Sequence, residues 1–146
     1  MLVIGPDAAR RAHFTVGSGW VLQRPDSNPK LNYVLRHGAV RLSVVFVFLA
    51  SRDEAGGLWT GLGRLLHAAN PAAHLSGPTH VTSSRGARGL TGVLRQGGKI
   101  GQATIYPSPG KNFAIEMISL GPPGAGPAQA AARQVIRSLS IPRMHP

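Results

Sequence analysis

The acidic side chains are the first candidates for catalysis, because acid–base chemistry needs two carboxylates, or a carboxylate and a histidine, in one cleft. The sequence has five of them: Asp7, Asp26, Asp53, Glu54 and Glu116. Asp53 and Glu54 are better explained as residues at the start of a helix, and Asp26 as a turn residue. Glu116 alternates into a strand of apolar residues, so we expect it at a strand edge or paired with an arginine. No catalytic residue is predicted, and the chain is expected not to be an enzyme.

Histidines are the only other side chains that could hold a metal ion, because the chain has no cysteine. His67, His74 and His80 are spaced by seven and six residues, which is not the spacing of zinc sites. The absence of cysteine also excludes disulfides, thiolate metal sites and cysteine nucleophiles. The sequence therefore predicts neither a metal site nor a cofactor.

Glycine-rich motifs that often mark catalytic or phosphate-binding loops are incomplete in this chain. The stretches Gly17-Ser18-Gly19-Trp20 and Leu75-Ser76-Gly77-Pro78 lack the glycine spacing of a serine-hydrolase elbow. The stretch Gly97-Gly98-Lys99 is followed by Ile100, where a Walker loop needs serine or threonine. These motifs indicate neither a serine hydrolase nor a nucleotide-binding loop.

The basic side chains are the remaining candidates for function. Lys and Arg number 16 against five acidic residues, so the formal net charge is +11. The planar guanidinium of arginine suits carboxylates and phosphates. We expect the basic residues that crowd one hairpin region, or share one helix face, to form a binding patch. Its members are Arg85, Arg88, Arg95, Lys99, Arg133 and Arg137.

An anionic lipid, a cell-wall polymer or an acidic protein is the expected partner of such a patch. Nucleic acid is a weaker expectation, because the eight aromatic residues are spread through the expected strands and one helix as core residues. Two other interpretations stay open: a basic surface without a specific ligand, and a homodimer.

Alternating and helical hydrophobic patterns give the elements that must position these residues. In the stretch 42–49, both the odd-numbered and the even-numbered positions carry apolar residues. Because these positions face opposite sides of a strand, the stretch is expected to be a central strand covered on both faces. Ser51 and Glu54 form a capping box that begins a helix ending at Asn70-Pro71. Gly57 and Gly61 lie one turn apart in that helix and suit a close approach to the sheet. Residues 71–79 are expected to be a loop, and a second helix is expected over 127–139. Strands are expected at residues 13–24, 31–36, 42–49, 80–84, 87–95, 100–106 and 113–120.

This order predicts an α+β fold, in which a mainly antiparallel sheet of six to seven strands is sandwiched by two helices. The length of 146 residues suits one domain. We divide the chain into an N-terminal segment (1–12), a single domain (13–142) and a tail (143–146). The sequence predicts no membrane-spanning helix and no signal peptide. It is also compatible with a domain cut away from a leader or anchor.

Three local patterns resemble a known family. They are Gly19-Trp20 in the first strand, Phe113-Ala114-Ile115-Glu116-Met117 in the last strand, and Val135-Ile136-Arg137-Ser138-Leu139-Ser140-Ile141 at the end of the last helix. With the element order, they resemble the PsbP-like fold, which photosystem PsbP proteins share with the Mog family of nuclear import factors, over residues 13–142. The resemblance implies a non-catalytic binding or assembly domain and transfers no site residues.

The bias toward Arg, Ala, Gly and Pro is similar to that of high-GC actinobacterial proteins, whose members of this family are often envelope-associated. The resemblance therefore implies an extracytoplasmic domain anchored to the membrane or envelope, if the chain is truncated. The leading hypothesis is a non-enzymatic binding or assembly domain with a basic surface for an anionic membrane, polymer or acidic protein. The alternatives are a nucleic-acid-binding module, and a small-ligand carrier or enzyme with a cleft between sheet and helix.

Overall fold

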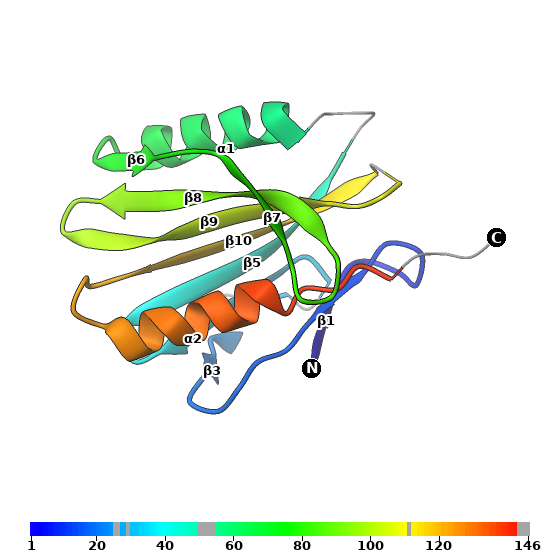
Figure 1. Cartoon of the computed structure of the whole chain (residues 1–146). Helices are drawn as coiled ribbons and strands as arrows, with labels where there is room; N and C mark the ends of the chain where they lie inside the picture. Colours follow the sequence, from blue (N-terminus) through cyan, green and yellow to red (C-terminus); the bar gives the residue numbers. More distant parts are fainter. Residues whose placement is uncertain (25–26, 29, 50–54, 111, 143–146) are drawn as a thin grey trace.

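An antiparallel sheet forms the middle layer of the protein, with one helix on each of its faces (Figure 1). The computed structural model describes residues 1–24, 27–28, 30–49, 55–110 and 112–142. Within them, eight strands form the sheet in the order β3-β4-β5-β10-β9-β8-β6, with β7 also paired to β8. The strands of this sheet are β3 (Val21–Leu22), β4 (Asn32–His37), β5 (Val40–Phe48), β6 (Ala73–Leu75), β7 (Thr79–Thr82), β8 (Arg88–Gln96), β9 (Lys99–Pro107) and β10 (Phe113–Gly121).

The predicted α+β sandwich is confirmed, and all the strand pairs of the sheet are antiparallel. The sheet has more strands than expected because residues 71–79, interpreted as a loop, contain β6. Both β6 and β7 pair with β8, β6 along its end and β7 along its beginning. The two short strands therefore cover successive halves of one edge.

Helix α1 (Ala55–Ala69) covers the β8–β9–β10 part of one face. Its Trp59 and Leu62 are buried against Leu90 and Ile105 of the sheet. The close approach is made by Gly92 of β8, where an added Cβ would lie 2.8 Å from the Trp59 ring. Glycines of the helix do not serve this purpose, since a Cβ at Gly57 or at Gly61 would meet no atom within 4 Å.

Strand β5 is central in the sheet, but it is not covered equally on its two faces. Val40, Leu42, Val44 and Phe46 are buried on the α2 side, whereas the residues between them are half-buried or exposed. The expectation of full burial on both faces is wrong, because α1 packs over β8, β9 and β10 and leaves β5 partly open.

Helix α2 (Gly126–Arg137) packs on the other face of the sheet, together with a separate two-stranded ribbon of β1 (Leu2–Ile4) and β2 (Ala12–Phe14). Ile4, Ala12 and Phe14 have no exposed surface. His13 exchanges two backbone hydrogen bonds with Ser140, each 2.8 Å, beyond the end of α2. Residues on both sides of the proposed boundary at position 13 thus pack in one core; the division of the chain stays a prediction.

Some of the expected features lie outside the described residues. They are the capping box of Ser51 and Glu54 with its neighbour Asp53, the turn residue Asp26, and the tail 143–146.

The C-terminal end of α2 is held by side chains of the sheet and of the β7–β8 turn. The buried Tyr106 hydroxyl donates a 3.0 Å hydrogen bond to the carbonyl of Ile136. The Ser83 hydroxyl donates a 2.6 Å hydrogen bond to the carbonyl of Leu139 and accepts the N–H of Ala87. Ser84, the residue after Ser83, donates hydrogen bonds from both its N–H and its hydroxyl to the carbonyl of Arg137. These bonds satisfy carbonyl groups that a helix end would otherwise leave unpaired.

We predict that Ser83→Ala lowers the free energy of unfolding by about 1–3 kcal/mol, because it leaves the Leu139 carbonyl unpaired in the core. Ser84→Ala is the matched control, since its backbone N–H still satisfies the Arg137 carbonyl. Its loss should be about 1 kcal/mol or less. Urea denaturation of the parent and both variants measures the difference. Equal losses in the two variants would contradict this account of how α2 is fastened.

Candidate functional site

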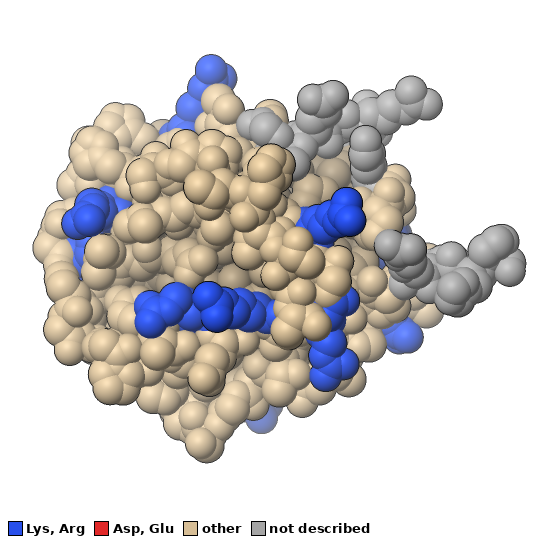
Figure 2. Space-filling model, viewed as in Figure 1, with Lys and Arg blue, Asp and Glu red and all other residues tan. Residues whose placement is uncertain are grey.

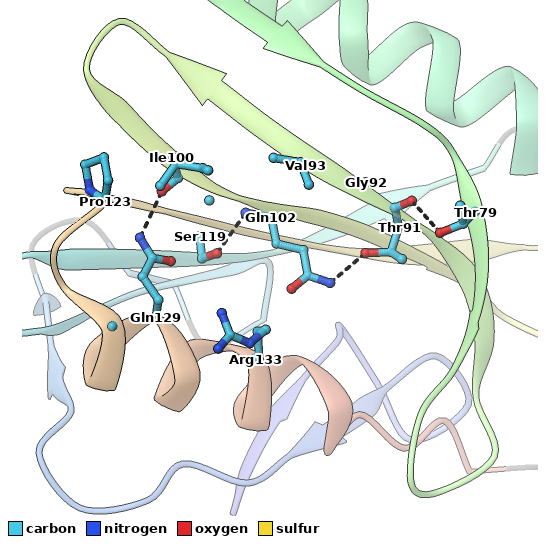
Figure 3. Close-up of a pocket in the computed structure, with 12 residues that line it drawn as sticks. Thr79, Thr91, Gly92, Val93, Ile100, Gln102, Ser119, Pro123, Gln129 and Arg133 are labelled. Atoms are coloured by element: carbon cyan, nitrogen blue, oxygen red, sulfur yellow. Dashed lines mark hydrogen bonds between the residues drawn. The ribbon is translucent and has the colours of Figure 1, made fainter.

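A cleft lies between α2 and strands β8, β9 and β10 (Figure 3). Its volume is about 440 Å³. Thr91, Gln102 and Ser119 contribute to its floor, and Gln129 and Arg133 of α2 line its other side. It lies on the α2 face of the sheet, which also carries the hydrophobic core around Tyr106 and Met117. The cleft begins where these apolar side chains end along β9 and β10.

The cleft exists because the sheet residues that face α2 change in character along strands β9 and β10. Near one end they are large and buried, as in Tyr106 and Met117. Toward the other end the same faces carry Gln102 and Ser119, which pair directly across the two strands. Ser119 is short, and the Gln102 amide bonds to Thr91 of the neighbouring strand, so a hollow with a polar floor remains under α2.

Hydrogen bonds fix the floor in place. The Gln102 side-chain amide donates to the Thr91 hydroxyl oxygen at 2.7 Å, and that hydroxyl lies 2.8 Å from the Thr104 hydroxyl. The backbone N–H of Gln102 donates to the Ser119 hydroxyl oxygen at 3.1 Å. The floor is therefore a connected polar network rather than a set of mobile side chains.

Helix α2 contributes two side chains one turn apart. Gln129 donates from its amide nitrogen to the carbonyl of Ile100 at 2.9 Å, which joins α2 to the edge of the cleft. Arg133 extends from the next turn into the space between Gln129 and Gln102, as Figure 3 shows. No described residue accepts a hydrogen bond from its guanidinium.

The predicted basic residues do not gather in one place. Arg133 lines the cleft, and Arg85 and Arg88 line another hollow beside Ile141. Ser84 bonds the carbonyl of Arg137, so Arg85 and Arg137 lie near each other at the end of α2. Arg95 and Lys99 flank the β8–β9 turn, and Arg95 lies seven positions from Arg88, about 23 Å along the strand. A single patch of these six residues stays a prediction, and Arg95 and Lys99 stand apart from the other four.

Described carboxylates do not neutralise the cleft. Asp7 pairs with Arg10 at 2.8 Å, and this hydrogen-bonded partner holds the pKa of Asp7 below its ordinary value. The face drawn in Figure 2 shows Lys and Arg side chains in several places and no Asp or Glu among the described residues. The α2 side of the sheet is therefore positively charged.

Glu116 lies on the opposite face of the sheet, in the middle of β10. Its neighbours across the strands are Val45 and Ile105, so the expected position at a strand edge is wrong. No described residue forms an ion pair with it. Burial among apolar side chains raises the pKa of its carboxyl group.

The histidines do not form a metal centre in the described part of the chain, where no group of three potential ligands comes together. The rings of His67 and His74 lie 6.1 Å apart between centroids. His13 has a buried ring nitrogen without a described hydrogen-bond partner, and burial lowers the pKa of this side chain. None of these histidines lines the cleft under α2.

Sequence reasoning identified Arg133 as a candidate but missed Thr91, Gln102, Ser119 and Gln129. Isolated polar residues in strands and on a helix give no signal of a shared cleft, because the cleft depends on where α2 lies across the sheet. In the described residues, no helix is both long and apolar enough to cross a membrane.

Comparison with known proteins shows the fold alone. No protein-family model matches the sequence, and no curated protein matches it. The Ran-binding protein Mog1p of Saccharomyces cerevisiae has a similar structure, with a TM-score of 0.60, 9% identity, and coverage of 88% of this chain and 89% of that one. LpqN of Mycobacterium tuberculosis, described as involved in cell envelope biogenesis, gives a TM-score of 0.57, 17% identity, and coverage of 94% and 87%. These likenesses confirm the Mog1/PsbP-like fold that the sequence resembles.

We predict that Glu116→Gln makes the protein more stable than the parent at neutral pH. The folded state holds the proton of Glu116 above the ordinary pKa of 4.5, where the unfolded chain has already lost it. Between the ordinary pKa and the raised pKa of Glu116, the folded parent binds more protons than the unfolded chain. The stability of the parent therefore falls as the pH rises through this range. The glutamine variant lacks this loss.

Urea denaturation of the parent and of Glu116→Gln at a series of pH values from about 4 to about 8, starting just below the ordinary pKa of Glu116, checks this prediction. The difference between the two proteins isolates Glu116 from other titrating groups, such as His13, which both proteins share. The gap should widen as the pH rises. A constant gap would mean that Glu116 is not desolvated in the folded protein.

Proposed function

We propose that the chain is a non-enzymatic binding domain of a cell-envelope protein, and that its α2 side takes a negatively charged partner. The observation that carries this proposal is the arginine row, which we define as Arg133, Arg137 and Arg85. Arg133 and Arg137 lie one turn apart on α2, and Arg85 follows Ser84, which is bonded to the carbonyl of Arg137. Figure 2 shows a stripe of basic atoms across the middle of this face.

The absence of neighbouring carboxylates supports binding rather than a structural use of these arginines. No described residue forms an ion pair with any member of the arginine row, so their charges are available to a partner. A row that runs from the cleft to the end of α2 suits an extended anionic partner, which contacts several arginines at once. The overall charge of +11 would also attract such a partner over a distance.

The similar structures support a binding role. Mog1p is named as a Ran-binding protein, which favours a protein partner in general, and LpqN favours a place in the cell envelope. Neither name describes an enzyme, and the cleft of this chain has no carboxylate or histidine to act as a base. An acidic protein is therefore one form of the anionic partner, and an anionic lipid or polymer surface is the other.

Nucleic acid is less well supported by the side chains at hand. Single strands are bound by exposed aromatic rings interleaved with basic residues. In this protein six of the eight aromatic side chains are buried, and one ring, that of Phe48, is exposed beneath Arg10. Tighter binding to duplex DNA than to an anionic lipid or an acidic chain would overturn the proposal.

We predict that the parent binds vesicles of phosphatidylcholine and phosphatidylglycerol, or polyglutamate, at low salt, and that added salt reverses the binding. Arg85→Gln/Arg137→Gln should weaken it by about 2 kcal/mol, or roughly 30-fold, at about 1 kcal/mol per basic residue. Co-sedimentation measures the vesicles, and fluorescence anisotropy measures labelled polyglutamate. The stronger of the two ligands distinguishes a lipid surface from an acidic chain.

Arg36→Gln/Arg41→Gln is the matched control. It removes the same charge from an exposed pair that lies across β4 and β5 on the face of the sheet opposite α2. An equal loss in this control would show that only net charge matters. Equal binding to neutral phosphatidylcholine vesicles, no binding to either anionic probe, or tighter binding to duplex DNA would each overturn the proposal.

A further inference from the structure

We propose that the cleft under α2 is a binding site for a small organic anion that carries hydroxyl groups, the class that includes uronates and sugar phosphates. The anionic group would lie on Arg133, and the hydroxyl groups on the side-chain amides of Gln102 and Gln129. This inference goes beyond the proposed function, which concerns a large partner along the outside of α2.

Arg133 supplies the site for the anionic group. It is the basic residue of the described cleft lining, and no carboxylate lines the cleft beside it. Figure 3 shows its guanidinium between Gln129 and Gln102. A guanidinium offers two parallel N–H donors, which match the two oxygens of a carboxylate or a phosphate.

The two glutamines are oriented so that each presents an oxygen to the ligand. Gln129 must use its amide nitrogen on the carbonyl of Ile100, because a carbonyl can only accept. The Thr91 hydroxyl donates to the carbonyl of Ala103, so its oxygen accepts from the amide nitrogen of Gln102. Each glutamine is left with an amide oxygen to which no described residue donates, and Figure 3 shows these oxygens on the Arg133 side.

This combination of groups selects a class of ligand. A bare anion would satisfy Arg133 but would bring negative charge toward the two amide oxygens. Hydroxyl groups would donate to those oxygens while the anionic group accepts from Arg133. The polar groups of the cleft are therefore matched by a molecule that has both.

The size and the walls of the cleft agree with a single sugar ring. The volume of about 440 Å³ falls within the range of sites that bind small molecules, about 300–1,000 Å³. Val93, Ile100 and Pro123 form apolar walls, against which the C–H face of a ring can pack. The remainder of the volume leaves room for water or for a substituent.

Titration of the ¹⁵N-labelled full chain with glucuronate and with glucose 1-phosphate tests the proposal by NMR. The side-chain amide signals of Gln102 and Gln129 and the Nε signal of Arg133 should shift together and saturate. Neutral glucose and inorganic phosphate are the control ligands, and each should bind at least about tenfold more weakly than the hydroxylated anions. Comparison of the carboxylate with the phosphate shows which anionic group the cleft prefers.

Arg133→Gln should weaken binding of the preferred ligand by roughly tenfold or more, since it removes a charge-assisted pair of hydrogen bonds. Arg64→Gln is the matched control: it also removes one exposed arginine from a helix, but that helix is α1, outside the lining of the cleft, and the change should leave this affinity unchanged. Arg133 is exposed, so neither variant is expected to unfold the protein.

Three results would overturn the inference. They are the absence of saturable shifts with both hydroxylated anions, shifts confined to residues outside the cleft, and equal affinity for inorganic phosphate. Loss of vesicle or polyglutamate binding in Arg85→Gln/Arg137→Gln, with sugar-anion binding intact, would separate the two members of the arginine row that lie outside the cleft from the cleft itself. The two proposals can therefore fail independently.

Discussion

The attachment of the end of α2 is the interaction on which the rest of this structure depends. Three consecutive or nearly consecutive carbonyls, those of Ile136, Arg137 and Leu139, are bonded by groups from the sheet and the β7–β8 turn. A buried carbonyl without a partner is costly, so the helix cannot slide or rotate without losing several bonds at once. The helix is thereby placed at one position across the sheet, and its remaining side chains are placed with it.

The two faces of the sheet differ in the side chains that they present. On the α2 side, apolar packing ends partway along β9 and β10, and the polar side chains of Gln102 and Ser119 lie beneath the helix. On the α1 side, Trp59 packs against Gly92, and Glu116 is partly buried. The polar cleft therefore lies on the α2 face, whereas the α1 face holds an apolar cluster around Trp59.

The sequence predicts those elements whose pattern is local. The helical hydrophobic pattern that begins at Pro127 predicts α2, and the pattern over 113–120 predicts β10. Strand β6 was missed because three residues carry no periodicity, and only their pairing with β8 makes them a strand. The place of Glu116 was missed for a related reason, since strand order in a sheet is decided by distant segments. Arg133 was identified by charge, but its neighbours in the cleft come together only through tertiary packing.

The backbone bridge between His13 and Ser140 brings the N-terminal ribbon β1–β2 together with the segment that follows α2. The two residues are far apart in the sequence, and their pairing completes the core around Ile4 and Phe14. During synthesis on a ribosome, the segment after α2 is made later than every strand of the sheet. The first ribbon then has no partner to complete its packing while most of the sheet is already available. The core around Ile4 and Phe14 is therefore completed late in synthesis. Until then, a nascent chain would expose this apolar surface to chaperones.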